Sequence, residues 1–114
     1  MPETIFDKIL AKTIPAQVVF EDQDVMAFKD TSPQAKVHVL VIPKQRARNL
    51  TELRAWNTAD VGVFFQKVAA VAAELGLAEK GYRVVLNTGK EGGQSVDYIH
   101  AHILGGEPLS GNFA

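Results

Sequence analysis

Two of the three histidines of this chain lie two positions apart in a short apolar segment near the C-terminus. The segment, residues 95–106, reads SVDYIHAHILGG, and its histidines are His100 and His102. In a β-strand alternate side chains share a face, so both imidazoles would lie on one face with their Cα atoms roughly 6.5–7 Å apart. At that spacing two imidazoles can contact the same small group.

Three interpretations of this pair differ in the chemistry that they require. In the first, the histidines have no function beyond their place on a surface or at an interface. In the second, His38 of the strand-like segment KVHVLVIPK joins them, and the three imidazoles are ligands of zinc. In the third, one neutral imidazole attacks phosphorus while the other donates a hydrogen bond to the phosphate or to the leaving group.

The loop before the pair favours the phosphate interpretation. Residues 92–95 read GGQS, in which two glycines let backbone N–H groups turn toward an anion, and Gln94 and Ser95 add side-chain donors. A metal site would favour a carboxylate beside the histidines, whereas strand alternation turns Asp97 to the opposite face. We therefore expect a phosphate site and no bound metal.

The segments that must position these residues follow an α+β pattern. Helices are predicted over residues 4–12, with Thr4 as N-cap, and over 57–75, where apolar residues recur at helical spacing between a cap at Asn57 or Thr58 and a terminating Gly76. Strands are predicted on both sides of the turn 21–24, over 36–44, over 82–89 and over 95–106. This order predicts a five-stranded antiparallel sheet with one long and one short helix.

Composition narrows the class of protein. A length of 114 residues predicts a single domain over 1–114, and a net charge of −1, without a basic run, argues against a nucleic-acid polymer as partner. The chain has no cysteine, which excludes disulfides and thiol chemistry. The start MPETIFDKIL has no signal-peptide pattern, and no apolar run is long enough to span a membrane. We expect a cytoplasmic protein with no membrane partner.

Several motifs, taken in order, resemble the histidine-triad (HIT) family, specifically its Hint-like branch of purine nucleoside phosphoramidases. The resemblance covers an N-terminal block over residues 4–44, the segment GYRVVLNTG and the segments GGQSV and HAHILGG. The family signature His-φ-His-φ-His-φ-φ, with φ hydrophobic, reads here Tyr98-Ile99-His100-Ala101-His102-Ile103-Leu104.

The resemblance implies a role for each matched position. His100 matches the nucleophile that attacks the α-phosphorus and forms a nucleotidyl-histidine, His102 the histidine that contacts the phosphate and leaving group, and His38 a further family histidine. The phosphate-contacting positions are Asn87, Gln94 and Ser95, framed by Gly93 and Val96. Asp30 matches the ribose-binding acid, and the nucleoside pocket is lined by Ile5, Phe6, Ile9, Phe28 and Leu40. Taken singly, each apolar residue is more often a core residue than a pocket residue, Asp30 would be a turn residue and Asn87 a strand-end cap.

The activity that the resemblance implies is hydrolysis of the P–N bond of purine nucleoside phosphoramidates. The reaction passes through the nucleotidyl-histidine, releases a nucleoside monophosphate and an amine, and needs no cofactor. The family also forms homodimers in which two five-stranded sheets join into one ten-stranded sheet, with the long helices at the interface. The expected partners are therefore a purine nucleotide or phosphoramidate and a second copy of the chain.

The chain departs from the family at two places. Tyr98 replaces the first histidine of the triad, and its phenol can donate one hydrogen bond but cannot be a cation at neutral pH. We expect hydrolysis to survive with an altered rate or pH dependence; the alternative is a non-catalytic nucleotide-binding or adaptor protein. The tail GEPLSGNFA is shorter than in relatives whose C-terminus carries an aromatic residue to the partner's site, where Phe113 is the candidate here.

Overall fold

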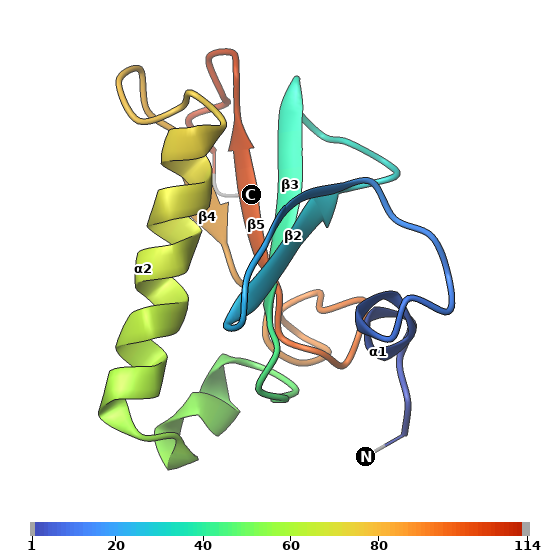
Figure 1. Cartoon of the computed structure of the whole chain (residues 1–114). Helices are drawn as coiled ribbons and strands as arrows, with labels where there is room; N and C mark the ends of the chain where they lie inside the picture. Colours follow the sequence, from blue (N-terminus) through green and yellow to red (C-terminus); the bar gives the residue numbers. More distant parts are fainter. Residues whose placement is uncertain (1, 113–114) are drawn as a thin grey trace.

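The computed structural model describes residues 2–112, which fold around one antiparallel sheet (Figure 1). Its strands are β1 (Val18–Glu21), β2 (Val25–Lys29), β3 (Val37–Pro43), β4 (Arg83–Val85) and β5 (Ala101–Gly105). Their order across the sheet is β1-β2-β3-β5-β4, with every neighbouring pair antiparallel. The predicted five-stranded α+β architecture is confirmed. This order places β5, which carries His102 and directly follows His100, beside β3, which carries His38. Phe113, the aromatic candidate in the tail, lies outside the described residues.

The predicted hairpin forms because Asp22 closes the turn between β1 and β2. Its Oδ1 accepts hydrogen bonds from the backbone N–H groups of Asp24 (2.8 Å) and Val25 (3.0 Å). Such an Asx turn offers the chain a local partner for donors that would otherwise be unsatisfied. The hairpin leads directly into the β2–β3 pair, whose far end carries Phe28 opposite Leu40.

Both predicted helices are present and lie on opposite sides of the sheet (Figure 1). Helix α1 (Ile5–Leu10) begins with a capping box, in which Thr4 accepts from the N–H of Asp7 and the Asp7 carboxylate accepts from the N–H of Thr4. Helix α2 (Thr58–Glu74) is capped by Asn57 and ends before Gly76, whose φ of +80° suits glycine. The face of α2 against the sheet buries Phe64, Val68, Val71 and Ala72.

The strand prediction was too long at two places. Residues 96–98 bend, and the N–H of Ile99 donates to the carbonyl of Ala47 at 2.8 Å, so β5 begins only at Ala101. The strand predicted over 82–89 is limited to β4. A 3-10 helix, η1 (Leu50–Ala55), was not expected, because six residues are too short to show a helical period.

Strand alternation from Ala101 onward separates the two faces of the sheet as predicted. Ile103 pairs with Val39, and both are buried on the face that α2 covers. His102 pairs with Leu40 on the other face, which α2 does not cover. Within residues 2–112 no helix is long and apolar enough to cross a membrane.

Candidate active site

A cavity of about 770 Å³ opens on the histidine side of the sheet, between β2, β3 and β5 and helix α1. It is lined by ten of the residues predicted from the sequence: Ile5, Phe6, Ile9, Phe28, Asp30, Leu40, Ser95, Val96, His100 and His102. The structure therefore brings together, in one space, apolar walls, a carboxylate and the two imidazoles. His38 lies directly beside His102, behind the cavity wall.

One ring nitrogen of His100, Nδ1, is hydrogen-bonded to the backbone, and the other, Nε2, is free to react. It is 4 % exposed, and its Nδ1–H donates to the carbonyl of Tyr98 at 2.7 Å. The ring of Phe6 lies edge-on to it, with ring centroids 5.0 Å apart. Burial lowers the pKa of His100 below its usual value, an effect that the Tyr98 carbonyl and the Asp30 charge oppose. The neutral ring thus keeps a lone pair on Nε2.

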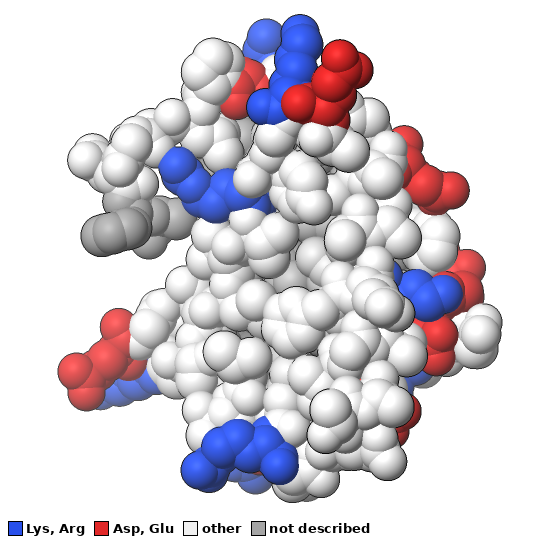
Figure 2. All heavy atoms as spheres, turned by 90° about the vertical axis from the view of Figure 1, so that its left-hand side faces the viewer, with Lys and Arg blue, Asp and Glu red and all other residues white. Residues whose placement is uncertain are grey.

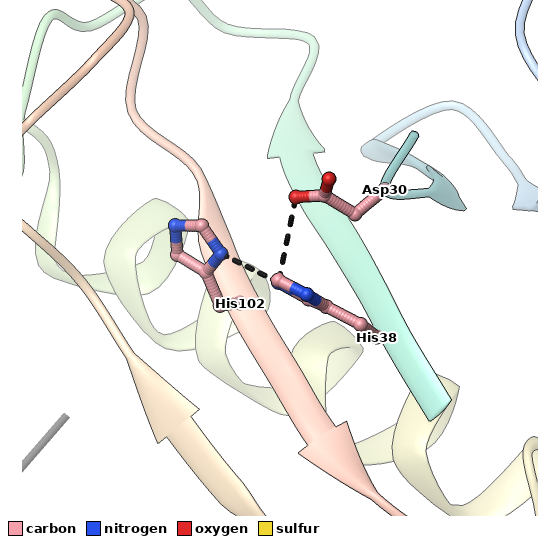
Figure 3. A group of neighbouring side chains, drawn as sticks. All are labelled: Asp30, His38 and His102. Atoms are coloured by element: carbon pink, nitrogen blue, oxygen red, sulfur yellow. Dashed lines mark hydrogen bonds and ion pairs between the residues drawn. The ribbon is translucent and has the colours of Figure 1, made fainter. Parts of the chain in front are cut away.

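His102 has the opposite tautomer, because a chain of hydrogen bonds assigns its proton. The backbone N–H of Gln34 donates to His38 Nδ1 at 3.0 Å, so the proton of the neutral His38 ring lies on Nε2. That N–H donates to His102 Nδ1 at 2.9 Å (Figure 3). The neutral His102 ring therefore carries its proton on Nε2. His100 and His102, with ring centroids 5.0 Å apart, form a pair of one nucleophile and one donor.

The pKa of His102 is lowered to about 4, chiefly by burial and further by the neighbouring His100 and His38. Asp30 opposes this shift with its negative charge. A ring with such a pKa is neutral over the physiological pH range, which is the state that the hydrogen-bond chain requires.

Within residues 2–112, Asp30, His38 and His102 form a cluster whose spacing could suit a metal ion, with one ligand atom from each within 4.8 Å of the others (Figure 3). The donor set does not fit a metal. A metal on His38 Nε2 needs the lone pair there, while the Gln34 amide needs a lone pair on Nδ1, and a neutral imidazole has only one. The three-histidine zinc site considered from the sequence also fails, because His100 is not in this cluster.

The glycine-rich loop is held by its own side chains. The Gln94 side-chain amide donates to the carbonyls of Arg48 and Val96, and its Oε1 accepts from the N–H of Gly89. Asn87 donates from Nδ2 to the carbonyl of Gly92 at 2.9 Å. Asn87, Gly93 and Gln94 are absent from the cavity wall, whereas Ser95 and Val96 line it. The first three thus stabilise the loop that presents the last two.

Tyr98 does not face the cavity. It is 1 % exposed, and its hydroxyl donates to the carbonyl of Pro43 at 2.5 Å. Burial and the nearby Asp7 raise the pKa of Tyr98 to about 12, so the phenol keeps its proton and remains a donor. The residue in place of the first triad histidine therefore acts on His100 only through its backbone carbonyl.

The cavity is also lined by six residues that were not predicted from the sequence: Ile14, Pro15, Ala16, Gln17, Lys29 and Thr31. The N–H of Lys29 donates to the carbonyl of Gln17 at 3.0 Å, which brings the 14–17 segment beside the end of β2. No periodicity marks this segment, and only its adjacency to predicted pocket residues could have indicated it.

Comparison with known proteins matches the model of the HIT domain family to residues 11–109. An uncharacterized HIT-like protein of Synechococcus elongatus is 51% identical over 108 residues, which cover 95% of this chain and 94% of that protein. The purine nucleoside phosphoramidase of Escherichia coli K12 is 43% identical over 107 residues, covering 94% and 90%. The structure of a HIT family hydrolase from Clostridium thermocellum superposes with a TM-score of 0.90 at 37% identity, covering 100% and 99%.

Proposed function

The chain belongs to the HIT domain family, and from this premise we propose that it hydrolyses the P–N bond of purine nucleoside phosphoramidates. The products would be a nucleoside monophosphate and an amine. The observation that carries the proposal is the complementary pair of tautomers, with a lone pair on His100 Nε2 and a proton on His102 Nε2.

In the first step, His100 Nε2 attacks the α-phosphorus, and the P–N bond breaks with its electrons passing to nitrogen. The nitrogen leaves as an amine because it has taken up one proton, either the substrate's own or one passed through His102. In the second step, water attacks phosphorus and gives up a proton to His102, if His102 passed one to the amine, or otherwise to solvent. The N–P bond to His100 breaks, and the nucleoside monophosphate is released. General acid assistance of this kind contributes roughly 10²–10⁴-fold.

The Tyr98 carbonyl supports both steps. When His100 becomes bonded to phosphorus, its ring carries a positive charge, which a carbonyl oxygen 2.7 Å from Nδ1 stabilises. The same contact keeps Nε2 directed to the cavity, so the nucleophile need not reorient between turnovers. The phenol of Tyr98 is outside this chemistry, and its presence is therefore compatible with catalysis.

The cavity suits a nucleoside in both shape and chemistry. We assign the base to the apolar wall of Ile5, Phe6, Ile9, Phe28 and Leu40, and the ribose hydroxyls to the Asp30 carboxylate. Oδ1 of Asp30 accepts from the N–H of Ser32, and this bond fixes the carboxylate at the cavity wall. We assign the phosphate oxygens to Ser95 and the adjacent backbone, with Asn87, Gly93 and Gln94 holding that loop in place.

The test is hydrolysis of adenosine 5′-monophosphoramidate by dialysed protein, with and without EDTA, beside His100→Ala as control. We expect adenylate release that survives EDTA and disappears in the variant, and a mass increase of one adenylyl group on His100 after rapid quenching. Absence of release from folded protein that still binds adenylate would overturn the proposal in favour of a binding module.

We also propose a homodimer formed through the outer face of α2 and edge strand β4. Figure 2 views this side, where charged side chains lie mostly around the margin of an uncharged central area. The exposed positions of α2 are largely small or apolar: Ala59, Gly62, Phe65, Ala69, Ala70 and Ala73. Val84 of edge strand β4 is also exposed, and it pairs with Ile103 on the side of the sheet on which α2 lies. A ten-stranded sheet, a cytoplasmic location and the absence of nucleic-acid and membrane partners stay predictions.

A further inference from the structure

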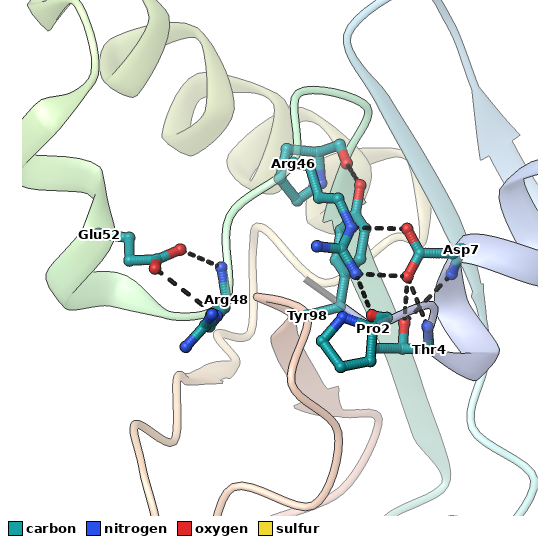
Figure 4. A network of polar contacts seen from close by, with 8 residues as sticks. Pro2, Thr4, Asp7, Arg46, Arg48, Glu52 and Tyr98 are labelled. Atoms are coloured by element: carbon teal, nitrogen blue, oxygen red, sulfur yellow. Dashed lines mark hydrogen bonds and ion pairs between the residues drawn. The ribbon is translucent and has the colours of Figure 1, made fainter.

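We propose that Arg46 and Asp7 are positioning residues for the nucleophile, and that they act by clamping the turn that carries Tyr98 against helix α1. The inference rests on the proposed function, because it assigns these residues to the alignment of His100 for attack. Figure 4 shows the network. Neither residue lines the cavity, so we assign neither of them a direct contact with substrate.

The first part of the clamp fixes the peptide that precedes His100. The Tyr98 hydroxyl bonds to the Pro43 carbonyl at 2.5 Å, and the N–H of Ile99 bonds to the Ala47 carbonyl at 2.8 Å. Between these two attachments the guanidinium of Arg46 lies over the Tyr98 ring, 5.7 Å from its centroid. Three contacts to residues 43–47 therefore determine where the Tyr98 carbonyl points, and that carbonyl determines the orientation of His100.

The second part joins this turn to α1. Arg46 Nε and Nη2 donate to the two oxygens of Asp7 at 2.7 Å and 2.8 Å, and Nη2 also donates to the Pro2 carbonyl at 2.7 Å (Figure 4). The paired geometry is one that a planar guanidinium provides and an ammonium does not. The Arg46 hydrogen bond is also the main reason why the pKa of Asp7 is well below its usual range.

Together these contacts support His100 from two sides. Helix α1, fixed by Asp7, carries Phe6, whose ring meets His100 edge-on and lies 6.3 Å from the Tyr98 ring. His100 is thus held from one side by the Tyr98 carbonyl and from the other by Phe6, and Arg46 connects the two supports. The bond to the Pro43 carbonyl requires the phenol hydroxyl of Tyr98, which the histidine of the family signature does not have. This arrangement is therefore specific to a tyrosine at position 98.

The test compares Arg46→Gln with Arg54→Gln. Arg54 is an exposed arginine on the same surface as Arg46, but its Nε donates to the Thr51 carbonyl within η1, and in the described part of the chain it makes no hydrogen bond to Pro2, Asp7 or Tyr98. We expect Arg46→Gln to slow formation of adenylyl-His100 in single turnovers by about tenfold, with a larger effect on kcat than on KM, because a misaligned nucleophile loses reactive orientation. Arg46→Lys should recover part of the rate, since it restores the cation but not the fork. Arg54→Gln should match the parent protein.

A second readout does not depend on turnover. Nitrogen-15 NMR of the His100 ring should show a single Nδ1–H tautomer in the parent protein and a mixture in Arg46→Gln. An unchanged tautomer together with an unchanged rate in a folded Arg46→Gln variant overturns the inference. If that variant does not fold, Asp7→Asn is judged by the same two criteria. If the parent protein proves inactive, the proposed function fails while the tautomer comparison still decides the role of Arg46.

Discussion

Nε2 of His38 lies 2.9 Å from Nδ1 of His102, and this contact decides which nitrogen of His102 carries a proton. The tautomer of His38 is fixed in turn by the backbone N–H of Gln34, which donates a hydrogen bond to His38 Nδ1. A backbone N–H cannot exchange its donor role for an acceptor role, so the direction of the whole chain is fixed by the fold. The catalytic pair is thereby prepared before substrate arrives.

His38→Ala and His38→Gln should separate this role from simple packing. A glutamine amide can place an N–H close to the position of His38 Nε2, whereas alanine cannot. We expect His38→Ala to reduce kcat by roughly 10–100-fold and His38→Gln to retain most of the activity. Equal losses in the two variants, measured by adenylate release at saturating substrate, would show that the donor to His102 is unimportant.

The pH dependence of nucleotidyl transfer should follow the lowered pKa of His100. Because burial disfavours the imidazolium, the free base persists at pH values where an exposed histidine is half protonated. We therefore expect the midpoint of the single-turnover pH profile to lie below 6.5, with the rate approaching a plateau at higher pH. Rapid-quench measurements from pH 4.5 to 8 check this, and an apparent pKa at or above 6.5 would contradict it.

His102 should make the protein less stable in mild acid. Its pKa falls from 6.5 to about 4 on folding, so the unfolded chain binds more protons between these values. The stabilisation is complete above pH 6.5 and is lost as the pH falls toward 4, by roughly 3 kcal/mol at most. Urea unfolding of the parent protein and His102→Asn at pH 7.5 and 4.5 tests this, with a smaller acid loss expected in the variant. Asp7 titrates below this window and does not interfere.

The predictions that succeeded rest on local periodicity and capping. Thr4 marked the start of α1, Asn57 and Gly76 bounded α2, and strand alternation put His102 on the open face. Each of these features depends on residues close together in the sequence and can therefore be predicted from local patterns. The resemblance to a family then assembled distant residues such as Phe6 and His100 into one pocket, which no local pattern could do.

What failed depends on contacts between distant segments. The strand prediction for 95–106 included Tyr98, but the bond from Ile99 to Ala47 replaces strand pairing there. The pairing of Arg46 with Asp7 joins residues 39 positions apart, and no spacing rule connects them. The assignment of Gln94 to phosphate contact stays a prediction, and the loop contacts of its side-chain amide with Gly89, Arg48 and Val96 could not be read from the sequence.

Gly92→Ala should disrupt the loop that presents Ser95. A Cβ at this position would collide with the carbonyl oxygen of Thr88, which is backbone and cannot move aside cheaply. We expect a loss of about 1–3 kcal/mol in stability and a rise in KM for the phosphoramidate, because the loop must shift. Gly111→Ala is the matched control, since nothing lies within 4 Å of its added Cβ. Equal behaviour of the two variants in urea unfolding and kinetics would refute this account of the loop.

Phe65→Asp should separate the proposed dimer into monomers. Phe65 is 38 % exposed on the outer face of α2, where its ring packs edge-on against Phe64 at 5.3 Å and gains little from its own chain's core. An exposed aromatic at the centre of a face of small residues is what a close helix–helix contact with a second copy would bury. A carboxylate there would remain unpaired in the interface, at a cost of several kcal/mol to association.

Sedimentation equilibrium of the parent protein, Phe65→Asp and Leu50→Asp distinguishes this effect from a general response to an added charge. Leu50 is similarly exposed, at 43 %, but belongs to η1 rather than to the face formed by α2 and β4. We expect twice the monomer mass for the parent protein and for Leu50→Asp, and the monomer mass for Phe65→Asp. A monomeric parent protein would refute the interface. A dimeric Phe65→Asp would move the contact to another face, because an unpaired aspartate could not remain at the centre of this one.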